Sequence, residues 1–391
     1  MQNNSSKFIP FALPEIGDEE ISDVVACIRS GWLTSGPKVA QFEHDFAMFL
    51  GGSVEAVAIN SATAGLHLAL EAIGIGPGDE VITTTHTFTA TAEVIRYLGA
   101  TPVLVDIEAS SLCIDANSVE AVITSRSKAI IPVHFAGRSA EMDDILYLAN
   151  KHGLKVVEDA AHALPTTYKS QLVGSLNSDA TVFSFYANKT ITTGEGGMLV
   201  TKDRLIAKRA RTMRLHGIDR DVFNRFTNKI PSWYYEVVAP GFKYNMTDIA
   251  AAIGVNQLRK VYAFQRKRAE IVDIYNQSFS NYPIILPPAQ NKGDIHSYHL
   301  YVIQIGDDVG IDRNQFIEKL FERQIGSSVH YIPLHLHPYW RDTYKLTPEM
   351  FPVSQQVYER TVSLPLYSKM TTLDVERVIG AVIDIFDSGT R

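Results

Sequence analysis

Lys189 is the residue of this chain whose type and setting most directly suggest chemistry. It follows an apolar run at residues 180–185, which predicts a buried strand, and a glycine-rich turn leads on to a second apolar run at residues 197–201. A lysine held in a cleft at a strand end is desolvated, which lowers its pKa and frees its amine for Schiff-base chemistry. Because most lysines are solvated at the surface, Lys189 alone leaves both interpretations open.

An acidic residue, Asp159, lies upstream of this lysine and just after the apolar pair Val156 and Val157. The pair predicts a strand, which would put Asp159 at its carboxyl end, where ligands of parallel sheets bind. A carboxylate there can keep the ring nitrogen of pyridoxal phosphate protonated, which makes this cofactor an electron sink. The alternative is a helix N-cap, because Asp before an alanine-rich stretch is a common start signal.

A third element lies within residues 56–73, where a short expected strand gives way to an expected helix. Leu66, Leu70 and Ile73 would share one face of that helix. Small and hydroxyl residues at the junction leave backbone N–H groups and the positive helix end free to meet a phosphate dianion. Asn60 and Ser61 would also cap a helix that binds nothing, so a plain capped helix is the alternative.

These motifs resemble the DegT/DnrJ/StrS family of nucleotide-sugar aminotransferases, which are fold-type I pyridoxal phosphate enzymes. The likeness runs nearly end to end, through residues 31–37, 60–64, 158–162, 184–197 and 363–366. The sequence of residues 239–248 is most similar to that of the group that includes the UDP-4-amino-4-deoxy-L-arabinose aminotransferase. The resemblance implies an α/β fold, with a large domain on a mainly parallel sheet flanked by helices and a smaller C-terminal α/β domain.

The resemblance also implies roles for single residues. Lys189 would form the covalent link to pyridoxal phosphate and later move a proton, while Asp159 would pair with the ring nitrogen. Phe88 would stack on the ring, and Asn245 would reach the phosphate from the neighbouring subunit, which makes the active sites shared products of a homodimer. The other implied contacts are Ala62, Thr63 and Ser184 at the phosphate, His86 and His162 near the cofactor, and Thr34, His330 and Tyr331 at the substrate.

The global composition is that of a soluble enzyme. At 391 residues the chain exceeds one ordinary core, so we expect a large domain over residues 1–265 and a small one over residues 266–391. A net charge of −7 argues against a nucleic-acid binder. No apolar run approaches the roughly 18 residues of a spanning helix, and the polar residues 1–7 do not have the apolar core expected of a signal peptide. Cys27 and Cys113 are expected as reduced thiols, and the expected location is cytoplasmic.

Continuous apolar runs at residues 81–84, 102–105 and 129–133 predict parallel strands covered on both faces. The domain boundary is expected inside a long helix near residues 265–270. Beyond it, residues 298–305 predict a strand, and Asp312 predicts the cap of a helix that carries Phe316 and Leu320.

Two other groups of residues have competing interpretations. His330, His335 and His337 could hold a metal, pack in the interior or contact substrate, and Pro333 and Pro338 with the absence of nearby Cys or acidic partners disfavour the metal. Arg209, Arg211 and Arg214, with aromatic residues near Trp233, suit either a nucleotide-sugar diphosphate or a solvated helix face. The segment from about residue 217 to 240 has no regular spacing of apolar residues and is expected to form a loop near the partner subunit.

The expected function is therefore a homodimeric aminotransferase that uses L-glutamate to aminate a UDP- or dTDP-linked 4-keto sugar, returning 2-oxoglutarate. A 3-keto sugar is the second choice. A sugar dehydratase with the same cofactor would replace the lysine, and a non-catalytic sugar-binding protein would not need Lys189, Asp159 and a phosphate loop together. No metal, nucleic acid or membrane is expected to take part.

Overall fold

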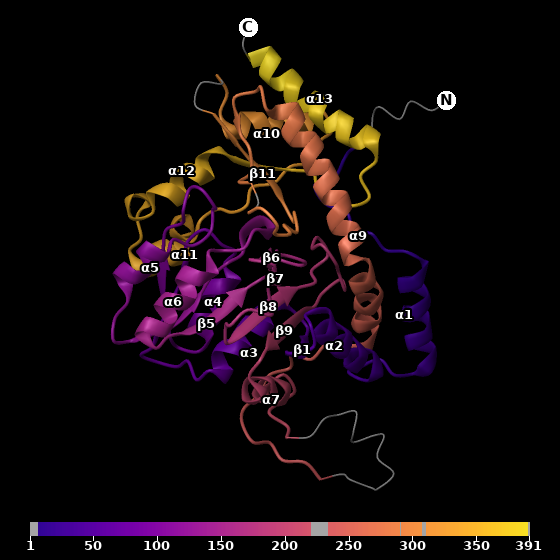
Figure 1. The fold of residues 1–391 in the computed structure, drawn as a ribbon, viewed down its shortest axis with the longest axis vertical. Coiled ribbons are helices and arrows are strands. Elements are labelled where there is room, and N and C mark those ends of the chain that lie inside the picture. The colour runs from indigo at the N-terminus through magenta and orange to yellow at the C-terminus, as the bar shows by residue number, and fades with distance from the viewer. Residues whose placement is uncertain (1–6, 220–233, 290, 307–309, 390–391) are drawn as a thin grey trace.

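A computed structural model describes residues 7–219, 234–289, 291–306 and 310–389. Its centre is a seven-stranded sheet in the order β1-β9-β8-β5-β4-β2-β3 (Figure 1). The strands are β1 Glu55–Ile59, β2 Glu80–Thr84, β3 Thr101–Val105, β4 Ser127–Ile131, β5 Lys155–Asp159, β8 Ala180–Ser184 and β9 Gly197–Thr201. All neighbours pair in parallel except β9, which is antiparallel to both β1 and β8.

Helices cover both faces of this sheet. Successive side chains of a strand point to opposite faces, and because the strands carry apolar residues on both sides, both faces must be buried. Val57, Val182 and Leu199 pack on one face, against α3 Ala62–Ala72, α4 Ala90–Tyr97 and α7 Arg204–Met213. Phe183 and Met198 pack on the other face with α2 Pro37–Phe49 and the first half of α9 Asp248–Phe279. Helices α5 Ala116–Val122 and α6 Met142–His152 continue that second layer over β4 and β5.

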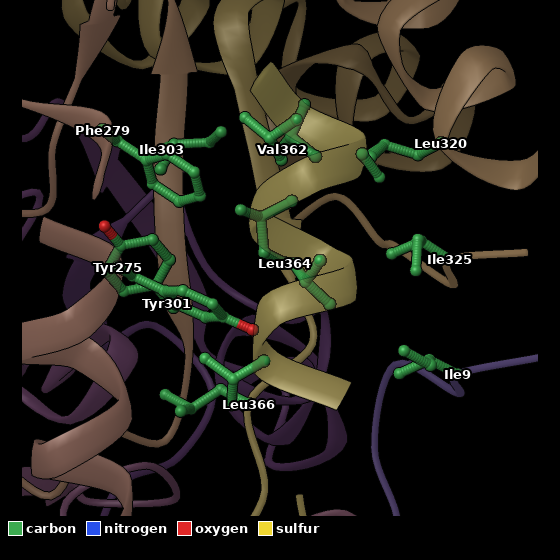
Figure 2. Packing of buried hydrophobic residues seen from close by; sticks show 14 of the residues in the cluster. Ile9, Tyr275, Phe279, Tyr301, Ile303, Leu320, Ile325, Val362, Leu364 and Leu366 are labelled. Atoms are coloured by element: carbon green, nitrogen blue, oxygen red, sulfur yellow. The ribbon is translucent and has the colours of Figure 1, made fainter. Parts of the chain in front are cut away.

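The C-terminal part has its own sheet and core. Strands β10 Ile284–Ile285, β11 Tyr301–Ile305 and β12 Thr361–Leu364 pair antiparallel and pack on α10 Arg313–Glu322 and α13 Thr372–Gly389. Figure 2 shows this core, in which Phe279 of α9 lies beside Ile303 and Tyr275 of α9 lies beside Tyr301. Helix α9, 32 residues long, thus joins the two cores. Ile9, near the N-terminus, also packs into this second core. The domain boundary near residue 265 stays a prediction.

The remaining elements connect these layers. They are α1 Asp18–Ser30, the hairpin β6 Thr167–Tyr168 and β7 Gln171–Leu172, α11 Pro338–Tyr344, α12 Pro352–Arg360 and three short 3-10 turns at Phe135–Gly137, Leu334–Leu336 and Pro348–Met350. None of the helices in the described ranges is long and apolar enough to cross a membrane. Asp312 caps α10 as predicted, accepting a hydrogen bond from the backbone N–H of Gln315.

The prediction of a strand over residues 298–305 was wrong at its start, because β11 begins only at Tyr301. Tyr298 has a φ of 48°, which takes the chain out of extended geometry. The preceding residues are bound instead by the turn at residues 135–137: the Leu300 N–H donates to the Ala136 carbonyl and the Ser297 N–H to the Gly137 carbonyl. This irregular segment places the side chain of His299 next to His162, with the two ring centroids 4.3 Å apart and the ring planes tilted by 44°.

Gly65 lets α3 approach the sheet closely. A Cβ at this position would lie 2.4 Å from Cδ1 of Ile59 and 2.6 Å from Cγ1 of Val182. Overpacking of this kind costs about 1–3 kcal/mol, which outweighs the ~1 kcal/mol that alanine gains over glycine in a helix. We therefore expect Gly65→Ala to lower the apparent melting temperature.

Gly380→Ala in α13 is the matched control, since no atom lies within 4 Å of the added Cβ. It should keep or raise the melting temperature through helix propensity alone. A Gly65→Ala protein that melts as high as the Gly380→Ala protein would show that α3 is not held against β1 and β8 as described.

Candidate active site

A cavity of about 500 Å³ lies at the carboxyl edge of the large sheet. It opens where β5 and β8 end and where α3 begins, which is the edge at which parallel α/β sheets bind ligands. The residues that line it are Ser61, Ala62, Thr63, Leu66, Thr87, Phe88, Ala90, Thr91, Val133, Asp159, Ala161, His162, Ser184, Tyr186, Asn188, Lys189, Glu195, Gly196, His299, His330 and Tyr331. Nine of the residues implied by the family resemblance are among them.

Lys189 lies in the turn after β8, as predicted. Its backbone N–H donates to the Tyr186 carbonyl at 2.9 Å. The N–H of Thr193 donates to the Phe185 carbonyl at 3.0 Å, so hydrogen bonds within the turn hold it closed. Burial lowers the pKa of Lys189 to about 8, and the attraction of Asp159 only partly opposes this effect. About a tenth of the amine is therefore unprotonated at pH 7, far more than in an ordinary lysine, and the unprotonated form is the one that a nucleophile requires.

Asp159 ends β5, the direct neighbour of β8 in the sheet. Its Oδ2 accepts a hydrogen bond from the Thr91 hydroxyl at 2.8 Å, and its Oδ1 accepts one from the Ala161 N–H at 3.1 Å. Burial raises the pKa of this carboxyl, against the opposing effect of these hydrogen bonds and of Lys189. Asp159 is followed directly by a turn and not by a helix, so the capping interpretation was wrong.

His162 and Tyr331 form a directional pair at the wall of the cavity. Nδ1 of His162 accepts the N–H of Ala136 at 3.2 Å, and burial together with Lys189 lowers the pKa of His162 well below its usual value. The neutral ring must then carry its proton on Nε2, which lies 2.8 Å from the Tyr331 hydroxyl and donates to it. The hydroxyl proton of Tyr331 remains available for a ligand.

The start of α3 supplies the expected phosphate site. The Ser61 hydroxyl accepts the N–H of Ala64 at 3.1 Å, whereas the first-turn N–H groups of Ala62 and Thr63 have no acceptor within the helix. Both residues line the cavity, as does Ser184 from β8. A Cβ on Gly197 would come within 2.8 Å of the Ala62 nitrogen, so this glycine permits the close approach of β9 to the helix start.

These residues fit pyridoxal phosphate in charge and in position. A phosphate dianion matches the N-terminus of α3, a ring nitrogen that carries a proton matches the Asp159 carboxylate, and an aldehyde matches the Lys189 amine. Phe88 lies at the rim, 59% exposed, with its ring centroid 6.1 Å from that of Tyr331, where an aromatic face is available for a flat ligand.

Thr34 and Asn245 are not among the residues that line the cavity of their own chain. The amide nitrogen of Asn245 donates to the Ser35 hydroxyl at 2.8 Å, and the carbonyl of Thr34 accepts the N–H of Asp248. The two residues therefore lie close together, outside the cavity. Their roles toward substrate and the partner's phosphate stay predictions.

Two of the remaining histidines, His86 and His335, lie in the interior of the protein. His86 is buried against Phe135 but does not line the cavity. His335 is an interior residue whose ring nitrogens form hydrogen bonds with the side chains of Thr85 and Gln355. Within the described ranges no group of three or more His, Cys, Asp or Glu side chains is placed to hold a metal ion.

Arg209 and Arg211 of α7 and Arg214, which directly follows this helix, are all engaged in ion pairs, so they are not simply a solvated helix face, and a role toward substrate stays a prediction. Arg209 pairs with Glu71 of α3, Arg211 with Glu55 of β1, and Arg214 with Glu43 of α2. Trp233 and most of the segment from 217 to 240 lie outside the described residues.

Sequence reasoning missed Thr91, Asn188, Glu195 and His299 as lining residues. Thr91 could have been suspected only from its place at the start of α4, because its partner Asp159 comes from a distant strand. His299 was hidden by its assignment to a regular strand.

The fold and the cavity define the class of protein: a buried lysine facing a buried carboxylate at the ends of neighbouring parallel strands, beside a helix N-terminus, is the arrangement of a fold-type I pyridoxal phosphate enzyme. Comparison with known proteins gives the family. Residues 14–383 match the DegT/DnrJ/EryC1/StrS aminotransferase family, and the chain belongs to it.

Several known proteins match this chain over nearly its whole length and nearly the whole of their own. Spore coat polysaccharide biosynthesis protein SpsC of Bacillus subtilis is 48% identical over 387 residues, covering 98% of this chain and 99% of SpsC. The PLP form of Spr1654 from Streptococcus pneumoniae, assigned as a sugar aminotransferase, matches with a TM-score of 0.90 and 34% identity over 98% of this chain and 99% of that one.

Helicobacter pylori PseC, an aminotransferase involved in the biosynthesis of pseudoaminic acid, matches with a TM-score of 0.89 and 30% identity over 98% of this chain and 100% of its own. The predictions of family, fold class, cofactor and enzyme class are thereby confirmed: the chain is a pyridoxal phosphate-dependent aminotransferase of the sugar aminotransferase family.

Proposed function

We propose that the enzyme transfers the amino group of L-glutamate to the keto carbon of a nucleotide-linked sugar, most simply a UDP- or dTDP-4-keto sugar. The observation that carries the proposal is Lys189, with a pKa of about 8, in one cavity with Asp159. The C4 position follows from the likeness of residues 239–248 to the group that makes 4-amino-4-deoxy-arabinose. The roles of SpsC in spore coat polysaccharide biosynthesis and of PseC in pseudoaminic acid biosynthesis support a role in making amino sugars for polysaccharides.

Pyridoxal phosphate, when bound, supplies an electron sink that lets a proton leave the carbon bearing the amine. Lys189 contributes the amine that holds the cofactor and then, once displaced, accepts the α-proton of the donor on Nζ and delivers a proton to the cofactor side. In the second half-reaction the same nitrogen moves protons in the reverse order. The cavity holds no second amine among its described lining residues.

Asp159 keeps the cofactor ring electron-withdrawing. Its two oxygens are oriented by Thr91 and Ala161, which leaves the carboxylate fixed while lone pairs remain for a ring N–H. A positively charged ring nitrogen beside it would hold the carboxyl ionised against the burial that raises its pKa. Phe88 covers one rim of the cavity and would limit tilting of the ring.

A panel of UDP- and dTDP-linked 4-keto and 3-keto sugars, supplied with L-glutamate and analysed by mass spectrometry, tests the proposal. We expect one 4-keto sugar to gain an amine with release of 2-oxoglutarate. Lys189→Ala should lower this rate at least about 10³-fold, since removal of a nucleophile that also moves protons is among the most severe losses.

Lys169→Ala is the matched control, because this lysine is exposed on the β6–β7 hairpin and pairs with Asp143. It should retain the wild-type rate. Elimination of a sugar hydroxyl without amination would favour the dehydratase, and a fully active Lys189→Ala protein would refute the role of Lys189.

We also propose that two subunits share each active site, with Asn245 reaching the partner's phosphate. In its own chain Asn245 lies against Ser35 and not in the cavity, which leaves room for a role across a two-fold axis.

Mixing Lys189→Ala with an inactive Asn245→Ala variant should then restore activity, because a mixed dimer holds one site with both native residues. About a quarter of the wild-type rate is expected when subunits exchange at random, since half of the dimers are mixed and each has one complete site. Size-exclusion chromatography with light scattering checks that the variants are dimers. An active monomer, or no recovery despite proven exchange, would contradict a shared site.

A further inference from the structure

His299 lies in the wall of the cavity with both ring nitrogens unused. The side chain is 4% exposed, and neither Nδ1 nor Nε2 has a hydrogen-bond partner among the described residues. Buried polar groups are normally paired, and those that are not call for an explanation. Since this imidazole borders a space large enough for a ligand, a ligand atom is the natural missing partner.

The ring of His299 is held in place by its surroundings. Its centroid lies 4.3 Å from that of His162, and its backbone is fixed by Leu300, whose N–H donates to the Ala136 carbonyl, and by the buried Arg268, whose Nη1 donates to the carbonyls of Tyr298 and His299. The imidazole is therefore positioned before any ligand arrives, as binding groups in preformed sites are.

The imidazole is also neutral. Burial lowers the pKa of His299 well below its usual value, and the nearby His162 and Lys189 lower it further. A neutral imidazole offers one N–H donor and one acceptor nitrogen, and so it can pair with an anion or with a hydroxyl.

An aminotransferase must bind two chemically different groups at one place. In the donor half-reaction the reacting carbon carries a carboxylate, whereas in the acceptor half-reaction the reacting sugar carbon is bonded to an uncharged, hydroxyl-bearing carbon. Lys189 is the only lysine or arginine among the described lining residues, and it is engaged in the chemistry. A guanidinium at this place would be left buried and unpaired whenever the sugar is bound, which is costly.

We propose that His299 contacts the substrate group next to the reacting carbon in both half-reactions, donating its N–H to the carboxylate of the amino donor and pairing with a hydroxyl of the sugar. The proposal rests on the function proposed above. It makes His299 a residue that serves two substrates with one uncharged side chain.

Dead-end complexes of the PLP-loaded enzyme test this contact without turnover. Neither 2-oxoglutarate nor the keto sugar can accept an amine from that form, so the Kd of each can be measured by titration calorimetry. His299→Phe, which keeps a ring against His162, should weaken both ligands at least about 10-fold, the value of one lost hydrogen bond in a buried site. His299→Asn, which keeps a donor and an acceptor, should recover part of both affinities.

His86→Phe is the matched control. This imidazole is likewise buried with both nitrogens unpartnered among the described residues, but it does not line the cavity. Both Kd values should stay within about twofold of wild type in this variant. Cofactor absorbance and thermal unfolding establish that each variant is folded and loaded.

Unchanged Kd values in His299→Phe, or a change for only one ligand, would overturn the proposal. Loss of bound cofactor with normal ligand affinities would instead assign His299 to cofactor positioning and would also overturn it. If wild type aminates no sugar of the panel, the proposed function fails and takes the sugar contact with it, while the 2-oxoglutarate titration still decides whether His299 holds the carboxylate.

Discussion

The enzyme depends on keeping two ionisable groups of opposite sign buried in one cavity without letting them neutralise each other. Lys189 and Asp159 come from the ends of β8 and β5, and the direct pairing of these strands sets their separation. Burial lowers the pKa of the lysine and raises that of the carboxyl, while their attraction opposes both shifts. Desolvation outweighs their attraction for both groups, so burial sets the direction of both pKa shifts.

The rest of the fold serves this cavity. Gly65 and Gly197 let α3 and β9 approach closely enough that Ala62 and Thr63 present the helix start to the same space. The C-terminal part contributes His330 and Tyr331 from the other side, so that both cores of the protein are needed for one site. The helix α9, which belongs to both cores, fixes how the two parts meet (Figure 1).

The sequence predicted those features that depend on a short stretch of chain. Asp159 and Lys189 each follow an apolar run, so strand ends and site residues could be placed together. Residues whose setting depends on distant partners could not be placed. His299 is carried into the cavity by hydrogen bonds to the turn at residues 135–137, and the arginines in and directly after α7 are occupied by glutamates far away in the sequence. The spacing of apolar residues along the chain does not predict either arrangement.

The pKa of Lys189 in the cofactor-free protein tests the central claim most directly. Trace labelling of lysines with acetic anhydride between pH 6 and 11, quantified by peptide mass spectrometry, reports each amine separately. Lys189 should become reactive with a midpoint near pH 8, while Lys169, whose pKa is raised by its hydrogen bond to Asp143, should become reactive only at clearly higher pH. In Asp159→Asn the midpoint of Lys189 should fall further, because the attraction that raises its pKa is gone. A Lys189 that titrates together with Lys169 would contradict the account.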